Sequence, residues 1–163
     1  MKVFYDGEFS TTAPQLGLVS IGAVREDGRE FYGVSTEFDP ATAHPWVKQH
    51  VLPQLPPLDD PAWMSREQLR AGFLDLLGDD PELWAWFGAY DHVALCQLWG
   101  SMPELPRVVP RFTMDVHQLW RHLGRPPLPA QSAGLHHALA DARHVKVRFE
   151  ALAEKAYRLG LDV

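Results

Sequence analysis

The sequence predicts an α/β fold: a mixed five-stranded sheet, with its three antiparallel strands first, and helices on both faces. Two patterns predict it. The first third of the chain holds three strand-like segments joined by short turns, which is typical of an antiparallel meander. Beyond it, strand-like segments alternate with helical ones, an order typical of a sheet covered by helices. With 163 residues, the chain has the length of one domain, residues 1–163, with a sizeable core.

The strands are identified by alternation, β-forming residues and turn signals. Asp27-Gly28 fits a hairpin turn, because glycine adopts positive φ without steric cost. We expect the first strand to lie at the centre of the sheet. The five strands are expected over residues 2–8, 17–24, 31–36, 82–87 and 111–113.

The helices are identified by three- and four-residue spacing and by their caps. Ser65 and Gln68 form a capping-box pattern, and Gly78 follows as a stop signal. The longest apolar stripe begins at Ala138 and predicts the clearest helix of the chain. Helices are expected over residues 46–51, 65–77, 90–99, 115–123 and 138–159.

The composition excludes some classes of protein. A net charge of −6 argues against a protein that grips nucleic acid through a broad basic surface. It does not exclude a nucleic-acid enzyme, because bound cations reverse the local field of acidic ligands. Cys96 is the single cysteine, which rules out an intrachain disulfide and favours a reducing compartment. No signal peptide or membrane-spanning segment is found, so a cytoplasmic protein is expected.

The first strand ends in two carboxylates, Asp6 and Glu8, separated by Gly7. Residues i and i+2 of a strand project from the same face, so both acids point the same way. Two like charges aimed at one place repel unless a cation lies between them, and Mg²⁺ prefers carboxylate oxygens. The alternative is that these acids only end a strand at a polar turn.

Two further acids occupy positions where chemistry is common. Asp91 follows the fourth strand, at the edge where open α/β sheets form crevices, although an N-cap is the ordinary role there. Asp141 lies in the first turns of the last helix, where an acid usually serves the helix dipole.

Taken together, D-x-E on the first strand, an Asp after the fourth, and H-x-x-x-x-D opening the last helix resemble the DEDDh family of 3′-to-5′ exonucleases. The resemblance covers nearly the whole chain and implies a ribonuclease H-like fold. Residues 82–100 are similar to ribonuclease AS, a group of adenylate-preferring 3′-exoribonucleases, and residues 34–40 and 50–53 are similar to the same group.

The resemblance implies that Asp6, Glu8, Asp91 and Asp141 bind two Mg²⁺ or Mn²⁺ ions, which together hold the scissile phosphate. It also implies that His136 is the general base. Five residues advance an ideal helix by about 500°, so His136 is expected on the loop before the last helix or at its first residue.

His137 is a competing candidate, because the tyrosine branch of this superfamily has its tyrosine four residues before the last Asp. The alternative for His137 is a surface histidine near a helix start. Phe9 directly follows the metal pair, and the resemblance suggests that it wedges against the terminal bases.

Other aromatic and basic residues have ordinary explanations of equal or greater weight. Trp46 and His50 either line the same groove or only pack. Trp84 and Trp86 share a strand face and are expected in the core, with a platform for nucleotides as the alternative. Arg143, Lys146 and Arg148 are expected to be solvated, with phosphate contact as the alternative.

The sequence therefore predicts a metal-dependent 3′-exoribonuclease that releases nucleoside 5′-monophosphates from single-stranded RNA with a free 3′ hydroxyl. A homodimer is expected from the relatives. The alternatives are a single-strand DNA exonuclease, a short-oligonucleotide scavenger, or a catalytically silent RNA-binding subunit.

Overall fold

The computed structural model describes residues 1–10 and 16–163 and confirms the α/β class. Within these residues the sheet has six strands, in the order β4-β3-β2-β1-β5-β6. β1 pairs antiparallel with β2 and parallel with β5, so the first strand lies inside the sheet as predicted. The strands are β1 (Lys2–Phe9), β2 (Leu18–Arg25), β3 (Glu30–Ser35), β4 (Trp63–Met64), β5 (Glu82–Ala85) and β6 (Met114–Asp115).

The sheet differs from the prediction in three places. The predicted number of five strands is wrong, because the two-residue β4 pairs with β3 and is too short to show a periodic pattern. The strand predicted at 111–113 lies instead at Met114–Asp115, since the Arg111 guanidinium donates to loop carbonyls at Leu105 and Pro106. β5 ends at Ala85, and Phe87 has φ of 59°, which an extended strand excludes.

The predicted helices are all present, with ends shifted by one or two residues. The capping box is confirmed: Ser65 accepts from the Gln68 N–H, and the Gln68 side chain accepts from the Ser65 N–H. In the described part of the chain, no helix is long and apolar enough to cross a membrane. The helices are α1 (Pro45–His50), α2 (Arg66–Leu77), α3 (Ala89–Leu98), α4 (Val116–His122) and α5 (Ala138–Arg158).

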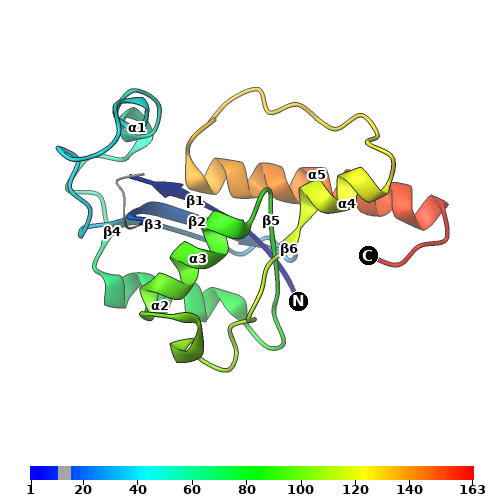
Figure 1. Ribbon diagram of the computed structural model, residues 1–163, viewed down its shortest axis with the longest axis horizontal. Coiled ribbons are helices and arrows are strands. Elements are labelled where there is room, and N and C mark those ends of the chain that lie inside the picture. Colours follow the sequence, from blue (N-terminus) through cyan, green and yellow to red (C-terminus); the bar gives the residue numbers. More distant parts are fainter. Residues whose placement is uncertain (11–15) are drawn as a thin grey trace.

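Helices cover both faces of the sheet, α4 and α5 on one and α2 and α3 on the other (Figure 1). On the α5 face, the Phe4 ring packs against Phe149 at a centroid distance of 5.1 Å. On the opposite face, the Tyr5 ring packs against Phe73 at 6.0 Å. Because side chains alternate along a strand, Asp6 and Glu8 share the face of Phe4 and emerge beneath α5.

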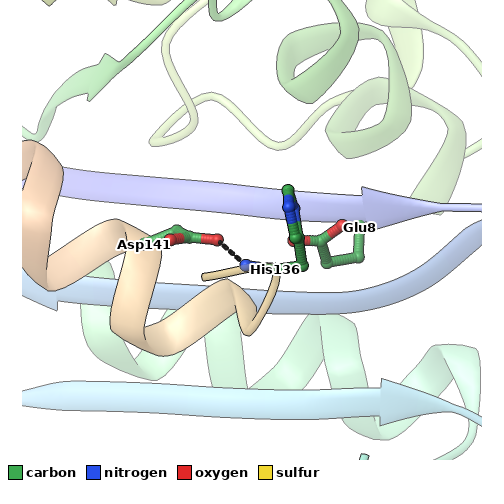
Figure 2. A group of neighbouring side chains, drawn as sticks. All are labelled: Glu8, His136 and Asp141. Atoms are coloured by element: carbon green, nitrogen blue, oxygen red, sulfur yellow. Dashed lines mark hydrogen bonds between the residues drawn. The ribbon is translucent and has the colours of Figure 1, made fainter. Parts of the chain in front are cut away.

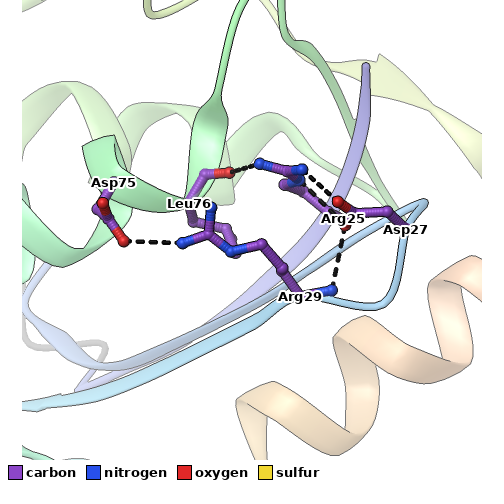
Figure 3. Close-up of polar contacts among 5 residues, drawn as sticks. All are labelled: Arg25, Asp27, Arg29, Asp75 and Leu76. Carbon is purple, nitrogen blue, oxygen red and sulfur yellow. Dashed lines mark hydrogen bonds and ion pairs between the residues drawn. The ribbon is translucent and has the colours of Figure 1, made fainter.

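The buried Arg25 ties the β2–β3 hairpin to the end of α2 (Figure 3). Its Nη1 donates to the Leu76 carbonyl over 3.2 Å, and its Nε donates to Asp27 over 3.1 Å. Arg29 adds a 2.9 Å ion pair to Asp75. A carbonyl in the last turn of a helix has no intrahelical donor, so Arg25 satisfies one end of α2 and fixes the hairpin to it.

Gly22 on β2 allows α5 to begin directly against the sheet. A Cβ added at Gly22 would lie 2.2 Å from the Leu139 nitrogen and 2.4 Å from the Ala138 carbonyl carbon. Both atoms belong to the backbone, which cannot rotate away as a side chain can. The height of the first turn of α5 above β1 and β2 is therefore fixed by the missing side chain.

Gly22→Ala should destabilise the protein by about 1–3 kcal/mol, the usual cost of overpacking. Urea unfolding gives that free energy, and amide exchange of residues 138–142 should accelerate. Gly33→Ala is the matched control on the opposite face, because its Cβ would meet side-chain atoms of Leu69, Met64 and Phe31 and no backbone atom of another element. Equal costs for the two variants would contradict the role given to Gly22.

Candidate active site

Four carboxylates from three elements converge under the start of α5. β1 supplies Asp6 and Glu8, α3 supplies Asp91 at its third residue, and α5 supplies Asp141 at its fourth. The alternative that Asp91 is an N-cap is wrong, because Gly88 occupies that position. The structure thus brings together the four acids that the sequence singled out.

Gly7 brings β1 and α3 close together. Its N–H donates to the Asp91 Oδ1 over 2.7 Å. A Cβ added at Gly7 would lie 2.9 Å from the Phe9 ring and 3.3 Å from that same Asp91 oxygen. The absence of a side chain therefore allows the Asp91 carboxylate to approach the backbone between the two acids of β1.

Asp141 is oriented by two donors from the loop that precedes α5. The His136 N–H donates to its Oδ2 over 2.8 Å (Figure 2). The Gln131 amide donates to its Oδ1 over 2.5 Å. Sequence reasoning missed Gln131, since a glutamine ten residues before an aspartate carries no periodic or motif signal.

The carboxylates repel one another in a poorly solvated place. Burial raises the pKa of Asp6 well above its ordinary value, and the charges of the other three carboxylates add to the rise. Burial raises the pKa of Glu8 to about 8, with repulsion from Asp141 and Asp91 contributing. Burial likewise raises the pKa of Asp91 to about 7, although the hydrogen bond from Gly7 opposes the rise.

His136 lies on the loop before α5, where the angular argument placed it. Its backbone φ of 65° is in the left-handed region, which is uncommon for a residue with a side chain. Ligand atoms of His136, Glu8 and Asp141 all lie within 4.8 Å of one another (Figure 2). The loop thus brings the imidazole to the carboxylates that its own N–H helps to orient.

His137, the next residue, is half-buried. It is the N-cap of α5, and its Nδ1 accepts from the Ala140 N–H over 3.4 Å. Its ring stacks on Tyr32 at a centroid distance of 4.5 Å. His137 is thus a partly exposed histidine at a helix start, as the alternative expected, and capping and stacking fix its ring.

A divalent cation fits the donor set. Hard cations bind carboxylate oxygens, and each added positive charge would relieve the repulsion that raises these pKa values. Within the described residues, no lysine or arginine forms an ion pair with any of the four acids. Their charge is therefore left for a ligand to compensate.

An adjoining cavity of about 410 Å³ opens beside Glu8 and holds both predicted aromatic contacts, Phe9 and Trp46. The Trp46 ring stacks on His50 at 4.5 Å and meets the His136 ring edge-on at 4.8 Å. It nevertheless remains 45% exposed. Packing and groove lining are thus both observed for Trp46, and the cavity is within the size range of small-molecule sites.

The three basic residues of α5 differ in their surroundings. Arg143 pairs with Glu30, and Lys146 pairs with Glu150, both at the surface as expected. Arg148 is instead half-buried, and its guanidinium lies 4.3 Å from the centroid of the Trp86 ring. Simple solvation therefore does not describe Arg148.

Comparison with known proteins gives consistent matches. The model of the family described as the 3′-5′ exoribonuclease Rv2179c-like domain matches residues 1–153. The chain is 53% identical over 156 residues to the 3′-5′ exoribonuclease Rv2179c of Mycobacterium tuberculosis strain ATCC 25618 / H37Rv, covering 93% of each chain. It is equally similar, at 53% and with the same coverage, to the 3′-5′ exoribonuclease MT2234.1 of strain CDC 1551 / Oshkosh.

Glu8→Gln should stabilise the cation-free protein most at high pH. The pKa of Glu8 in the folded protein, about 8, exceeds its ordinary value of 4.5, so the stability of the wild type falls as pH rises between these values. The glutamine mimics the protonated acid and should gain at least about 1 kcal/mol at pH 8, roughly 2–4 °C in Tm, and nothing near pH 4.5. Thermal unfolding in EDTA at several pH values measures this.

The exposed Glu154→Gln is the matched control and should show no such pH-dependent gain. Adding Mn²⁺ should reverse the ranking at pH 8, because it stabilises the wild type more than Glu8→Gln. A constant difference between Glu8→Gln and the wild type across pH would contradict the electrostatic account.

Proposed function

This chain belongs to the Rv2179c-like family of 3′-5′ exoribonucleases, and we propose that it removes nucleoside 5′-monophosphates from the 3′ end of single-stranded RNA with two divalent cations. The observation that carries this proposal is the convergence of four repelling carboxylates without a basic partner among the described residues. Mg²⁺ and Mn²⁺ both suit such oxygen ligands. The proposal places the chain among DEDDh exonucleases of ribonuclease H-like fold.

Asp6, Glu8, Asp91 and Asp141 would hold the cations. When bound, two such ions neutralise the charge of a phosphodiester and make water more acidic. The protein contributes the fixed positions of its carboxylates: Gly7 holds one oxygen of Asp91, and the loop before α5 holds both oxygens of Asp141. These hydrogen bonds restrict the rotation of the Asp91 and Asp141 carboxylates. Cation binding then has less side-chain freedom to remove.

His136 would accept the proton of the attacking water. A general base must come within hydrogen-bond reach of that water, and His136 already lies beside Glu8 and Asp141. Trp46 meets its ring edge-on and limits the directions that the imidazole can take. The capping bond of His137 and its stacking on Tyr32 argue against this role for His137.

The cavity beside Glu8 would hold the terminal nucleotide, with Phe9 and Trp46 on its walls. Stacking of a base on an aromatic ring is worth about 1–3 kcal/mol, which is enough to hold a mononucleotide end in register. A preference for adenylate is proposed from the resemblance of residues 82–100 to ribonuclease AS. A homodimer is proposed on the same ground.

An oligoadenylate with a free 3′ hydroxyl should be shortened to mononucleotides, and a 3′-phosphate should protect it. A matched panel of oligo-A, oligo-U, oligo-C and DNA tests the base and sugar preference, with oligo-A expected to be cleaved fastest. Asp6→Ala is the control and should retain less than about a tenth of the wild-type turnover, since it would remove one of the four carboxylates that would hold the cations. EDTA should stop the reaction, and Mn²⁺ should restore it.

Internal fragments from the 3′-blocked strand would contradict the exonuclease proposal and indicate an endonuclease. Faster cleavage of DNA than of RNA would favour a single-strand DNA exonuclease. Binding of RNA without any cleavage would favour a silent RNA-binding subunit.

His136→Asn should lower turnover by about 10²–10⁴-fold, the usual contribution of a general base. Asparagine tolerates the left-handed backbone at this position but cannot take a proton. His137→Asn is the matched control, because asparagine is a good N-cap, and it should stay within about threefold of the wild type. Steady-state rates at saturating Mn²⁺ measure both, and the reverse ranking would assign the base to His137.

A further inference from the structure

A second aromatic surface lies on the other side of the carboxylates from Trp46. It consists of Trp86, Phe87, His117 and Trp120, which we call the β5–α4 cluster. The Phe87 and His117 rings are 4.2 Å apart at their centroids, and the Trp86 ring lies 5.1 Å from His117. Trp120 closes the cluster at 5.2 Å from His117. Trp86 and Trp120 also pack against the core, so Phe87 and His117 form its outer part.

The outer part of the cluster is exposed, but hydrogen bonds fix its backbone. Phe87 is 59% exposed although its backbone has a φ of 59°, a conformation that is costly for a bulky residue. The Asp115 carboxylate holds the backbone next to Phe87 and at His117. Its Oδ2 accepts from the Gly88 N–H over 3.2 Å, and its Oδ1 accepts from the His117 N–H over 2.7 Å. One carboxylate thus holds the Phe87 turn against the start of α4.

Arg148 adds a positive charge to this surface. Its guanidinium lies over the Trp86 ring at 4.3 Å, and its Nε is buried without a hydrogen-bond partner among the described residues. Within the same residues it forms no ion pair, unlike Arg143 and Lys146 on the same helix. Asp141 attracts this half-buried cation without pairing directly with it, so the guanidinium can still contact a ligand that has both a phosphate and a base.

The cluster adjoins the carboxylates. β5 runs parallel to β1 with Trp84 opposite Phe4, and Trp86, just beyond the end of β5, packs against the same core cluster as these two residues. Arg148 follows Asp141 by seven residues, two turns along one side of α5. The Trp46 cavity is at the opposite flank, because α1 and α4 lie on different sides of β1 (Figure 1).

We propose that the β5–α4 cluster and Arg148 bind the strand on the 5′ side of the scissile phosphate, beyond its first nucleotide, with Phe87 and His117 stacking a base and Arg148 contacting a backbone phosphate. This inference rests on the proposed single-stranded RNA substrate. An enzyme that removes one nucleotide at a time from a 3′ end has only that terminal nucleotide on the 3′ side of the scissile phosphate. If the Trp46 cavity takes it, a second base-sized aromatic surface across the carboxylates meets the remaining strand.

The test measures binding without turnover. Full-length Asp6→Asn protein is titrated, in Mn²⁺, into fluorescently labelled oligoadenylates of two and eight nucleotides, and anisotropy gives both Kd values. In the Asp6→Asn protein, the second substitution Phe87→Ser should weaken binding of the longer strand by about 5- to 100-fold, the range expected for the loss of one stacking ring. The Kd of the dinucleotide should change much less, because it barely reaches the cluster.

Tyr157→Ser is the matched control, since Tyr157 is an aromatic residue that is 83% exposed near the far end of α5. It should keep the length dependence of the Asp6→Asn parent. Arg148→Gln should lower the slope of log Kd against log salt for the longer strand by about 0.7, the value for one phosphate contact with a single strand. Phe87→Ser should leave that slope unchanged.

Equal loss for both strand lengths in Phe87→Ser, or no loss in either, would overturn the proposal. So would a parent protein whose Kd does not improve from two to eight nucleotides. Thermal unfolding of each variant identifies any that fails to fold, and Phe87→Leu, which lacks the ring but keeps apolar bulk, then takes the place of Phe87→Ser. Absence of RNA cleavage by the wild type, together with these binding results, would contradict the exonuclease proposal and support this one.

Discussion

The mutual repulsion of four poorly solvated carboxylates is the constraint on which the rest of the structure depends. No single element could hold them together, because adjacent acids on one flexible segment would turn away from one another. The fold uses three elements that pack rigidly: β1 inside the sheet, α3 on one face and α5 on the other. The acids are then oriented by donors that carry no positive charge, namely the N–H groups of Gly7 and His136 and the Gln131 amide. A lysine or arginine in those places would relieve the repulsion and leave no charge for a cation.

The three elements can bring the carboxylates together only if they approach one another closely, and this requires residues without side chains where they meet. Gly22 brings the first turn of α5 onto β2, while Gly7 brings Asp91 onto β1. Two glycines on neighbouring strands therefore set the distances between elements that are far apart in the chain. Arg25, by contrast, secures the hairpin to the end of α2, on the face of the sheet that α2 shares with α3.

The parts of this arrangement that follow from local periodicity were predictable from the sequence. Asp6 and Glu8 had to share a strand face, and an apolar stripe of more than five turns predicted α5. Asp91 and Asp141 had ordinary local explanations, so only the resemblance to a known family joined them to the first pair. What escaped prediction depends on tertiary contacts: β4 exists because β3 offers it an edge, Gln131 matters because its loop folds back over α5, and His137 stacks on Tyr32 from another strand.

Two residues with left-handed backbones, His136 and Phe87, stand on either side of the carboxylates, and their strain has local compensation. The N–H of His136 bonds to Asp141, so the same turn that directs the imidazole also orients a ligand. At Phe87 the compensation is indirect, since Asp115 holds the following N–H of Gly88 and ties the turn to α4. Neither side chain gains burial from its conformation, because His136 is partly exposed and Phe87 is largely so. Hydrophobic packing therefore does not explain why a histidine and a phenylalanine occupy positions that glycine would adopt without steric cost. The proposed roles of the two rings, His136 beside the carboxylates and Phe87 against the RNA strand, would explain it.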